Sequence, residues 1–133
     1  MKTLKLITSI VLMAVMYSCH KDHSDVLTDG TYSGQATQYT ALAGGAVSTN
    51  VVLKITSPSY DTYLSIQSNA PYAQGSYKIS GSQVTFTNTI LYNVNTKSGP
   101  ILNGTYSFKV KADSLTLTQF TNGYPVIYSL KRQ

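Results

Sequence analysis

The sequence predicts an all-β protein, an eight-stranded antiparallel up-and-down meander closed into a small barrel, and three observations support this prediction. Apolar and polar residues alternate along almost every segment after Gly30, which is the period of a strand with one buried face. No segment carries apolar residues at helical spacing over three turns. Pairs of turn-forming residues, of which Asn122-Gly123 is the clearest, separate the alternating segments as in hairpins.

The N-terminal segment has the features of a lipoprotein signal peptide. Lys2 and Lys5 precede an apolar run at 6–16, which would span about 16 Å as a helix and is too short to cross a bilayer. The one cysteine of the chain ends the tetrapeptide Met16-Tyr17-Ser18-Cys19, which resembles the lipobox of bacterial lipoproteins. The resemblance implies cleavage before Cys19 and acylation of its thiol, so that residues 1–18 are a signal peptide. A free cysteine at this boundary is the alternative.

Residues 19–29 are expected to be the lipidated Cys19 and a flexible tether, because they are polar and show no periodicity. By resemblance to lipoprotein sorting in Gram-negative cells, His20 in place of aspartate after the cysteine implies passage to the outer membrane. The domain would then be periplasmic or exposed at the cell surface. His20 and His23 are expected to be solvated tether residues.

Residues 30–133 are expected to form the barrel domain. The alternation and the turn residues predict strands at 31–40, 49–57, 62–67, 74–80, 83–93, 103–111, 114–121 and 124–131. A two-residue turn at Asn122-Gly123 pairs Leu117 with Tyr128. A second two-residue turn, at Ala112-Asp113, pairs Phe108 with Leu117.

Two turns upstream extend the same pattern. A two-residue turn at Gly81-Ser82 pairs Tyr77 with Phe86. A four-residue loop from Pro58 to Asp61 is predicted to pair Ile55 with Leu64.

These registers gather apolar side chains on one face of the sheet. The predicted core of the C-terminal half consists of Tyr106, Phe108, Val110, Leu115, Leu117, Val126, Tyr128 and Leu130. The lysines that follow the tether in these strands fall on the opposite face, at positions 54, 78, 109, 111 and 131. An open sheet of this kind would leave its apolar face in water and its edges unpaired, so eight strands are expected to close into a barrel. A two-sheet β-sandwich is the alternative.

An eight-stranded meander that opens with Gly30-Thr31-Tyr32 and follows a lipid anchor resembles the lipocalin-like lipoproteins of Gram-negative cell envelopes. The resemblance covers residues 30–131, and Tyr32 stands where lipocalins carry the tryptophan of Gly-x-Trp. It implies a calycin-type barrel that binds a ligand at its open end.

Successive connections of a meander lie at opposite ends of the barrel. The short connections at 58–61, 81–82 and 112–113 therefore close one end, to which the tether attaches. The longer connections at 41–48, 68–73 and 94–102 gather at the other end, together with the turn at 122–123. Small barrels bind ligands at such an open end. The candidate lining residues are Tyr39, Leu42 and Val47 from the first connection, Tyr72 from the third, and Tyr92, Ile101 and Leu102 around the fifth. The alternative is that these side chains fill the opening and complete the core.

The composition argues against catalysis. After the tether the chain has no His, Cys or Glu, and its carboxylate side chains are Asp61 and Asp113, both in predicted turns. A Ser-His-Asp triad, a pair of catalytic carboxylates or a metal site cannot be assembled from this set. We therefore expect no enzyme activity, no cofactor and no metal.

The net positive charge raises the question of an anionic partner, either nucleic acid or lipid. The chain has a net charge of +5, but nucleic-acid binding would require clustered basic residues with exposed aromatic side chains, and an envelope protein does not meet such a partner. Lys109, Lys111, Lys131 and Arg132 are expected near the closed end, where they either rest against anionic lipid headgroups or only keep the surface soluble.

The expected function follows from these points. The sequence predicts a non-enzymatic lipoprotein that is anchored in the outer membrane through Cys19 and binds a small apolar or amphiphilic molecule at the open end of the barrel. The alternative is a module that binds or inhibits another envelope protein and whose barrel is filled.

Overall fold

The structure is a computed structural model that describes residues 26–41, 45–64, 70–91 and 100–133. The predicted signal peptide, Cys19, Leu42 and Tyr92 lie outside these residues. The strands are β1 (Gly30–Tyr39), β2 (Ala46–Thr56), β3 (Ser59–Leu64), β4 (Ala73–Ser80), β5 (Gln83–Asn88), β6 (Gly104–Lys111), β7 (Ser114–Thr121) and β8 (Tyr124–Arg132). Among the described residues, no helix is long and apolar enough to span a membrane.

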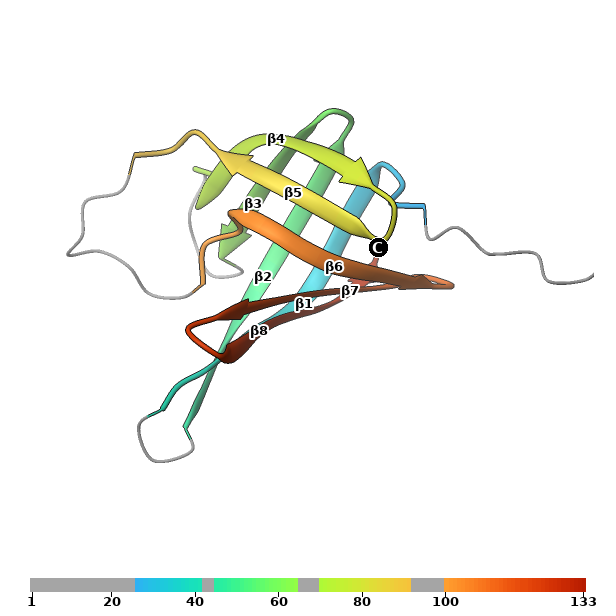
Figure 1. Cartoon of the computed structure of the whole chain (residues 1–133). Helices are drawn as coiled ribbons and strands as arrows, with labels where there is room; N and C mark the ends of the chain where they lie inside the picture. The colour runs from blue at the N-terminus through green and yellow to red at the C-terminus, as the bar shows by residue number, and fades with distance from the viewer. Residues whose placement is uncertain (1–25, 42–44, 65–69, 92–99) are drawn as a thin grey trace, which may run out of the picture.

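The eight strands form a closed barrel, as predicted from the alternation (Figure 1). Each strand is antiparallel to the next along the chain, and β1 pairs with β8 from Tyr32↔Arg132 to Gln38↔Val126. This last pairing removes both free edges of the sheet and therefore distinguishes the barrel from the two-sheet sandwich.

Three of the four predicted registers are confirmed. Tyr77 pairs with Phe86, Phe108 with Leu117, and Leu117 with Tyr128. Ala112 and Asn122 adopt positive φ angles of 51° and 53°, which are the left-handed conformations that tight hairpin turns require. The lysines of the strands are exposed on the outer face, as the registers predicted.

The predicted register between β2 and β3 is wrong. The turn is not Pro58–Asp61 but Ser57-Pro58, so that Ile55 pairs with Tyr60 and not with Leu64. The reason is the ring of Tyr60, which is only 1% exposed and makes an edge-to-face contact with Phe86 at 4.9 Å between ring centroids. Burial of this large aromatic side chain requires a strand position instead of a loop position. The shift is an even number of residues, so the inward and outward faces are unchanged.

Strand β5 is shorter than predicted, because it ends at Asn88 and not at residue 93. The side-chain Oδ1 of Asn88 accepts hydrogen bonds from the backbone N–H groups of Gln74 and Ile90, at 3.2 and 3.3 Å. An asparagine that bonds its own backbone two residues on replaces the strand ladder with a turn.

The barrel interior is filled with side chains. All eight predicted core residues of the C-terminal half are buried except Val110, which is partly buried against the core. Phe86, Tyr106 and Tyr128 continue the aromatic contact of Tyr60 across the interior, with ring centroids 5.9 and 5.8 Å apart and nearly perpendicular planes. Such edge-to-face packing is a favourable arrangement of aromatic rings.

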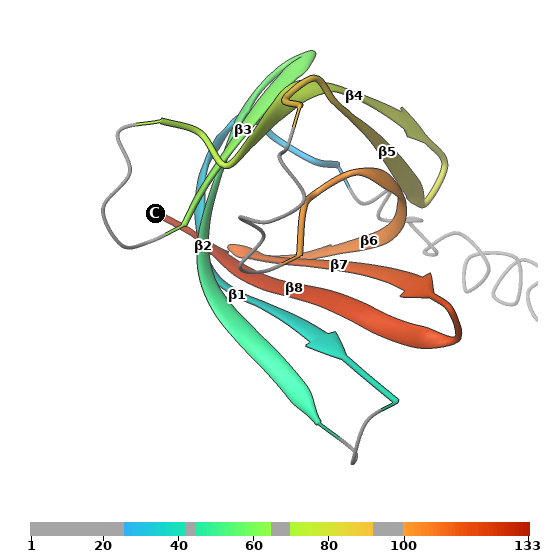
Figure 2. The same cartoon turned by 90° about the vertical axis from the view of Figure 1, so that its left-hand side faces the viewer.

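The two ends of the barrel are named here by their connections. The turn end carries the turns at 57–58, 81–82 and 112–113, together with the start of β1 and the end of β8. The loop end carries the connections β1–β2, β3–β4 and β5–β6 and the turn at 122–123. Figure 2 views the molecule from the loop end and shows the β1–β2 hairpin extending past its neighbours. The predicted distribution of short and long connections is therefore present.

Candidate functional site at the loop end

Two tyrosine hydroxyls hold the segment 100–102 across the loop end. The hydroxyl of Tyr60 donates to the carbonyl oxygen of Leu102 at 2.7 Å, and that of Tyr128 donates to the carbonyl oxygen of Pro100 at 2.9 Å. Leu102 is 1% exposed and belongs to the core. In Figure 2 this segment lies inside the ring of strands. The segment thus closes much of the opening that the sequence predicted as a ligand mouth.

The tyrosines beneath this segment are neutral well above physiological pH. Burial raises the pKa of Tyr106 to about 12, although its hydrogen bonds with the backbone of Asn103 and with the hydroxyl of Tyr128 act in the opposite direction. Burial also raises the pKa of Tyr128, and the nearby Tyr106 raises it further. The phenols therefore act here as hydrogen-bonding groups and not as acids.

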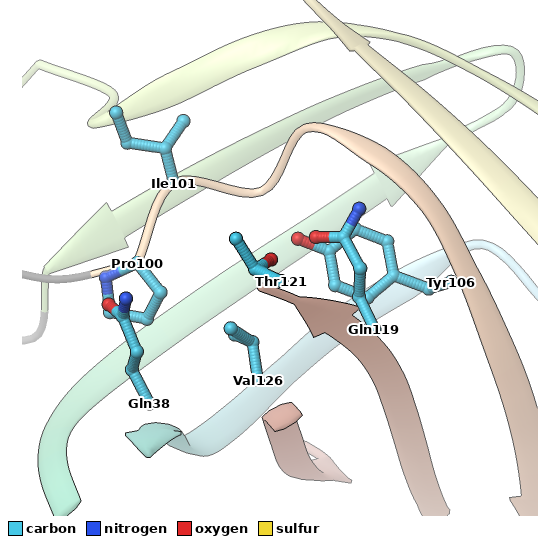
Figure 3. Close-up of a pocket in the computed structure, with 7 residues that line it drawn as sticks. All are labelled: Gln38, Pro100, Ile101, Tyr106, Gln119, Thr121 and Val126. Carbon is cyan, nitrogen blue, oxygen red and sulfur yellow. The ribbon is translucent and has the colours of Figure 1, made fainter. Parts of the chain in front are cut away.

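A pocket of about 210 Å³ remains beside the segment 100–102. It is lined by Gln38, Pro100, Ile101, Tyr106, Gln119, Thr121 and Val126. Figure 3 shows Gln38 beside Pro100 on one side of the pocket and Gln119 beside Tyr106 on the other. The lining combines apolar walls with amide and hydroxyl groups and contains no charged side chain.

The polar side chains of this pocket are free to bind. Within the described residues, the side chains of Gln38, Gln119 and Thr121 form no hydrogen bond. Gly104 leaves room for the amide of Gln119, because a Cβ on Gly104 would lie 2.6 Å from Gln119 Nε2. Gly104 also has a φ of +93°, a conformation that a side chain would strain.

Aromatic and aliphatic side chains are exposed around this pocket. Phe120 is 71% exposed and Tyr39 is 41% exposed. Phe120 pairs with Pro125 across β7 and β8, and Tyr39 ends the neighbouring strand β1. Val47 and Tyr124 are also exposed at the loop end, on β2 and β8, where their pairing with Gln38 and Thr121 gives them the inward parity at the rim of the barrel. We call Tyr39, Val47, Phe120 and Tyr124 the loop-end surface.

Charged side chains are confined to the other end. Among the described residues, the charged side chains are Asp29, Lys54, Asp61, Lys78, Lys109, Lys111, Asp113, Lys131 and Arg132. All of them lie in the half of the barrel near the turn end, within a few residues of a tight turn or of a barrel terminus. The half near the loop end has no charge within the parts of the chain that the structure describes.

The structure places the predicted lining residues in different environments. Tyr39 and Val47 are exposed at the loop end, and Ile101 lines the pocket. Tyr72 is half-buried before β4, where its N–H donates to the carbonyl oxygen of Thr62 at 2.6 Å. Leu102 is in the core, and its contribution there is to packing. Ligand binding by Tyr39, Leu42, Tyr72, Tyr92 and Leu102 stays a prediction.

Several residues of the site were missed by the sequence reasoning. Gln38, Gln119 and Thr121 belong to strands, whereas the candidates were sought in the loops. Phe120 could have been found, because the register that places Leu117 in the core places Phe120 on the outer face. An aromatic side chain on the outward parity of a strand is a signal for a binding surface.

The comparisons with known proteins identify no relative. No protein-family model matches the chain, and neither a curated protein nor a solved structure matches it. The closed eight-stranded antiparallel barrel is compatible with a lipocalin-like fold. No group of three His, Cys, Asp or Glu side chains that could hold a metal ion occurs within the described residues.

Proposed function

We propose that this protein is a non-enzymatic interaction module, a lipocalin-like lipoprotein of the cell envelope that docks onto another envelope protein through the loop-end surface. The observation that carries the proposal is the separation of charge from exposed aromatic side chains. Depletion of charge together with enrichment of aromatic residues is typical of the buried centre of protein interfaces. The loop-end surface has this composition, and the turn end does not.

The pocket supports a protein partner more than a carried small molecule. Its volume of about 210 Å³ is below the range of about 300–1,000 Å³ that is typical of small-molecule sites. A pocket of this size accommodates one uncharged side chain of a partner, which is how central interface residues commonly bind. The free amides of Gln38 and Gln119 would then pair with polar groups of the partner.

The attachment of the N-terminal segment supports the same orientation. Leu27 is buried, and Arg132 Nη2 donates to the carbonyl oxygen of Asp29 at 2.7 Å, so the chain enters the barrel at the turn end. With Cys19 lipidated, the turn end would face the membrane and the loop-end surface would face away from it. A partner could then reach the loop end without competing with the bilayer.

Site-specific photo-crosslinking in intact cells tests the proposal. A photoreactive amino acid at position 120 of the full chain should crosslink one protein of defined mass. The matched control is position 79, since Ile79 is also exposed, at 38%, but lies next to the turn at 81–82. Equal crosslinking from both positions, or none from position 120, would contradict the proposal.

Substitutions then connect the crosslink to the surface. Tyr39→Ser should abolish crosslinking from position 120, because the strand registers place Tyr39 and Phe120 on the outer face on either side of Pro125, whereas Ile79→Ser should leave it intact. Both side chains are exposed, so unfolding free energies should change by no more than about 0.5 kcal/mol. Loss of the crosslink in both variants would point to a non-specific effect.

A small amphiphile bound at the loop end is the second candidate, favoured by the apolar wall and free amides of the pocket. Organic extraction and mass spectrometry of the purified full chain would test it. One compound in a constant ratio to the protein, lost in Gln119→Leu, would support this candidate. Its absence, with a specific crosslink from position 120, would support the interaction module.

A further inference from the structure

A second concave site lies on the outer face of β6 and β7, next to the β4–β5 turn. It is a groove of about 440 Å³ lined by Ser82, Ser107, Phe108, Lys109, Thr116 and Thr118. The backbone N–H of Phe108 donates to the carbonyl oxygen of Ser82 at 3.0 Å and so fixes the turn against the strands. The volume is within the range of about 300–1,000 Å³ that is typical of small-molecule sites.

The strand register arranges four side chains of the groove as a rectangle. Ser107 pairs with Thr118, and Lys109 pairs with Thr116. Paired residues of neighbouring strands are about 5 Å apart, and alternate residues of one strand are about 7 Å apart. Four polar groups thus surround an area that one phosphate group and an adjoining hydroxyl would cover.

The groove offers hydrogen-bond donors and no carboxylate. Within the described residues, the hydroxyls of Ser82, Thr116 and Thr118 form no hydrogen bond. The ammonium group of Lys109 adds three donors and a positive charge. The hydroxyl of Ser107 donates to the carbonyl oxygen of Thr118 at 3.2 Å, which leaves its lone pairs for a donor from a ligand.

The charges around the groove favour an anion. Lys109 forms no ion pair with any described residue. Lys111 on β6 and Lys131 on β8 are both strand partners of Ser114 on β7, so two further positive charges lie next to the groove. The carboxylates are placed elsewhere: Asp29 Oδ1 accepts from the N–H of Ser57 at 2.9 Å, and Asp61 on β3 is the strand partner of Lys54 on β2, on the opposite side of the barrel from the groove. Asp113 lies at the end of the hairpin, beyond Lys111.

We propose that this groove binds the phosphate group of a phosphorylated polyol. Lys109 and the hydroxyls of Thr116 and Thr118 donate to the phosphate oxygens, and Ser107 accepts from a hydroxyl of the polyol. Either a glycerophospholipid headgroup or a soluble sugar phosphate has this chemistry. The groove lies toward the turn end, where the N-terminal segment leaves the barrel, so a headgroup would reach it without reorientation of the protein.

The test uses the full 133-residue chain in neutral-detergent micelles, so that the N-terminal segment is the same in every sample. Glycerol 3-phosphate and inorganic phosphate are titrated as soluble probes, and phosphatidylglycerol is added to the micelles as the lipid probe. Backbone amide shifts are followed by NMR. We expect saturable shifts confined to 82, 107–109 and 116–118, with glycerol 3-phosphate binding more tightly than inorganic phosphate.

The variants separate a site from general charge attraction. Lys109→Gln should weaken binding about tenfold, which is the loss expected for one charged contact to phosphate. Lys54→Gln removes the same charge from the opposite side of the barrel and should change binding less than twofold. Equal effects of the two variants, or shifts spread over all lysine-bearing strands, would overturn the proposal.

The probes identify the source of the phosphate. Tighter binding of phosphatidylglycerol than of glycerol 3-phosphate would identify a lipid headgroup, because a micelle concentrates it near the groove. The opposite order would identify a soluble phosphorylated polyol. Absence of shifts with all three probes would reject the site, and it would leave the proposed docking of the loop end unaffected.

Discussion

At the turn end of the barrel, neighbouring strands are joined by two-residue turns and the surface carries six cationic and three acidic side chains among the described residues. At the loop end three of the four connections are longer, and the surface has exposed aromatic side chains and no described charge. A segment of the chain is held across the opening there by tyrosine hydroxyls. The difference shows that local sequence determines one end, whereas contacts between distant residues determine the other.

Side chains alternate between the inner and outer faces along the strands at both ends of the barrel. A substitution that violates this alternation should have the largest effect on stability. Leu117→Asp should prevent folding, because it places an unpaired charge at a side chain that is fully buried, a loss of more than about 4 kcal/mol. Circular dichroism and urea denaturation would measure it. Thr116→Asp, on the exposed face of the same strand, is the control and should fold. A folded Leu117→Asp protein would show that the faces are inverted.

High pH should destabilise the barrel through two buried tyrosines near the loop end. Unfolded tyrosines lose their protons near pH 10, whereas Tyr106 keeps its proton to about pH 12 and Tyr128 also has a raised pKa. The folded state then binds more protons, so stability falls as pH rises above about 10, by about 1.4 kcal/mol per pH unit for each tyrosine. Urea denaturation between about pH 9 and pH 11 measures this slope.

The matched variant for this pH dependence is Tyr128→Phe. It removes one of the two titrating phenols, and the slope above about pH 10 should fall to about half. An unchanged slope would mean that these two tyrosines do not cause the loss of stability.

Removing one hydroxyl at each end compares how the two ends are held. Tyr60→Phe leaves the buried carbonyl oxygen of Leu102 without its donor and should cost about 1–3 kcal/mol. Tyr32→Phe removes a donor to the part-buried carbonyl oxygen of Thr28, at 2.8 Å, and should cost about 1 kcal/mol or less. Urea denaturation gives both values. Faster amide hydrogen exchange at 102–104 is expected only in Tyr60→Phe.

The smallest effect on stability is expected for Cys19→Ser, which changes the location of the protein and not its fold. The variant should leave the membrane fraction, since it lacks the acylated thiol proposed to anchor the chain. Carbonate washing followed by immunoblotting measures the distribution. Ser18→Ala is the control and should stay membrane-bound, and an unchanged distribution of Cys19→Ser would refute lipid anchoring.

The turn end could be predicted from sequence because its information is local. At Gly81-Ser82 and Ala112-Asp113, the turn residues and the parity of their neighbours determine the register. The turn at Ser57-Pro58 is the exception, since its register depends on the contact of Tyr60 with Phe86, a residue far along the chain.

The loop-end pocket could not be predicted for the same physical reason. Its wall at Pro100 and Ile101 exists because Tyr60 and Tyr128, from two other strands, bond the segment 100–102. No periodicity or turn motif encodes those two hydrogen bonds. Exposure of Phe120, in contrast, follows from parity alone and was available in the sequence.

The pairing of β1 with β8 has a consequence for biosynthesis. The last strand of the barrel supplies one neighbour of the first, and the N–H of Gln133 donates to the carbonyl oxygen of Thr31 at 2.9 Å. A nascent chain therefore cannot close the barrel until its C-terminal residues have left the ribosome. Joining residues so distant in sequence is slow, so the pairing of β1 with β8 is expected late in folding.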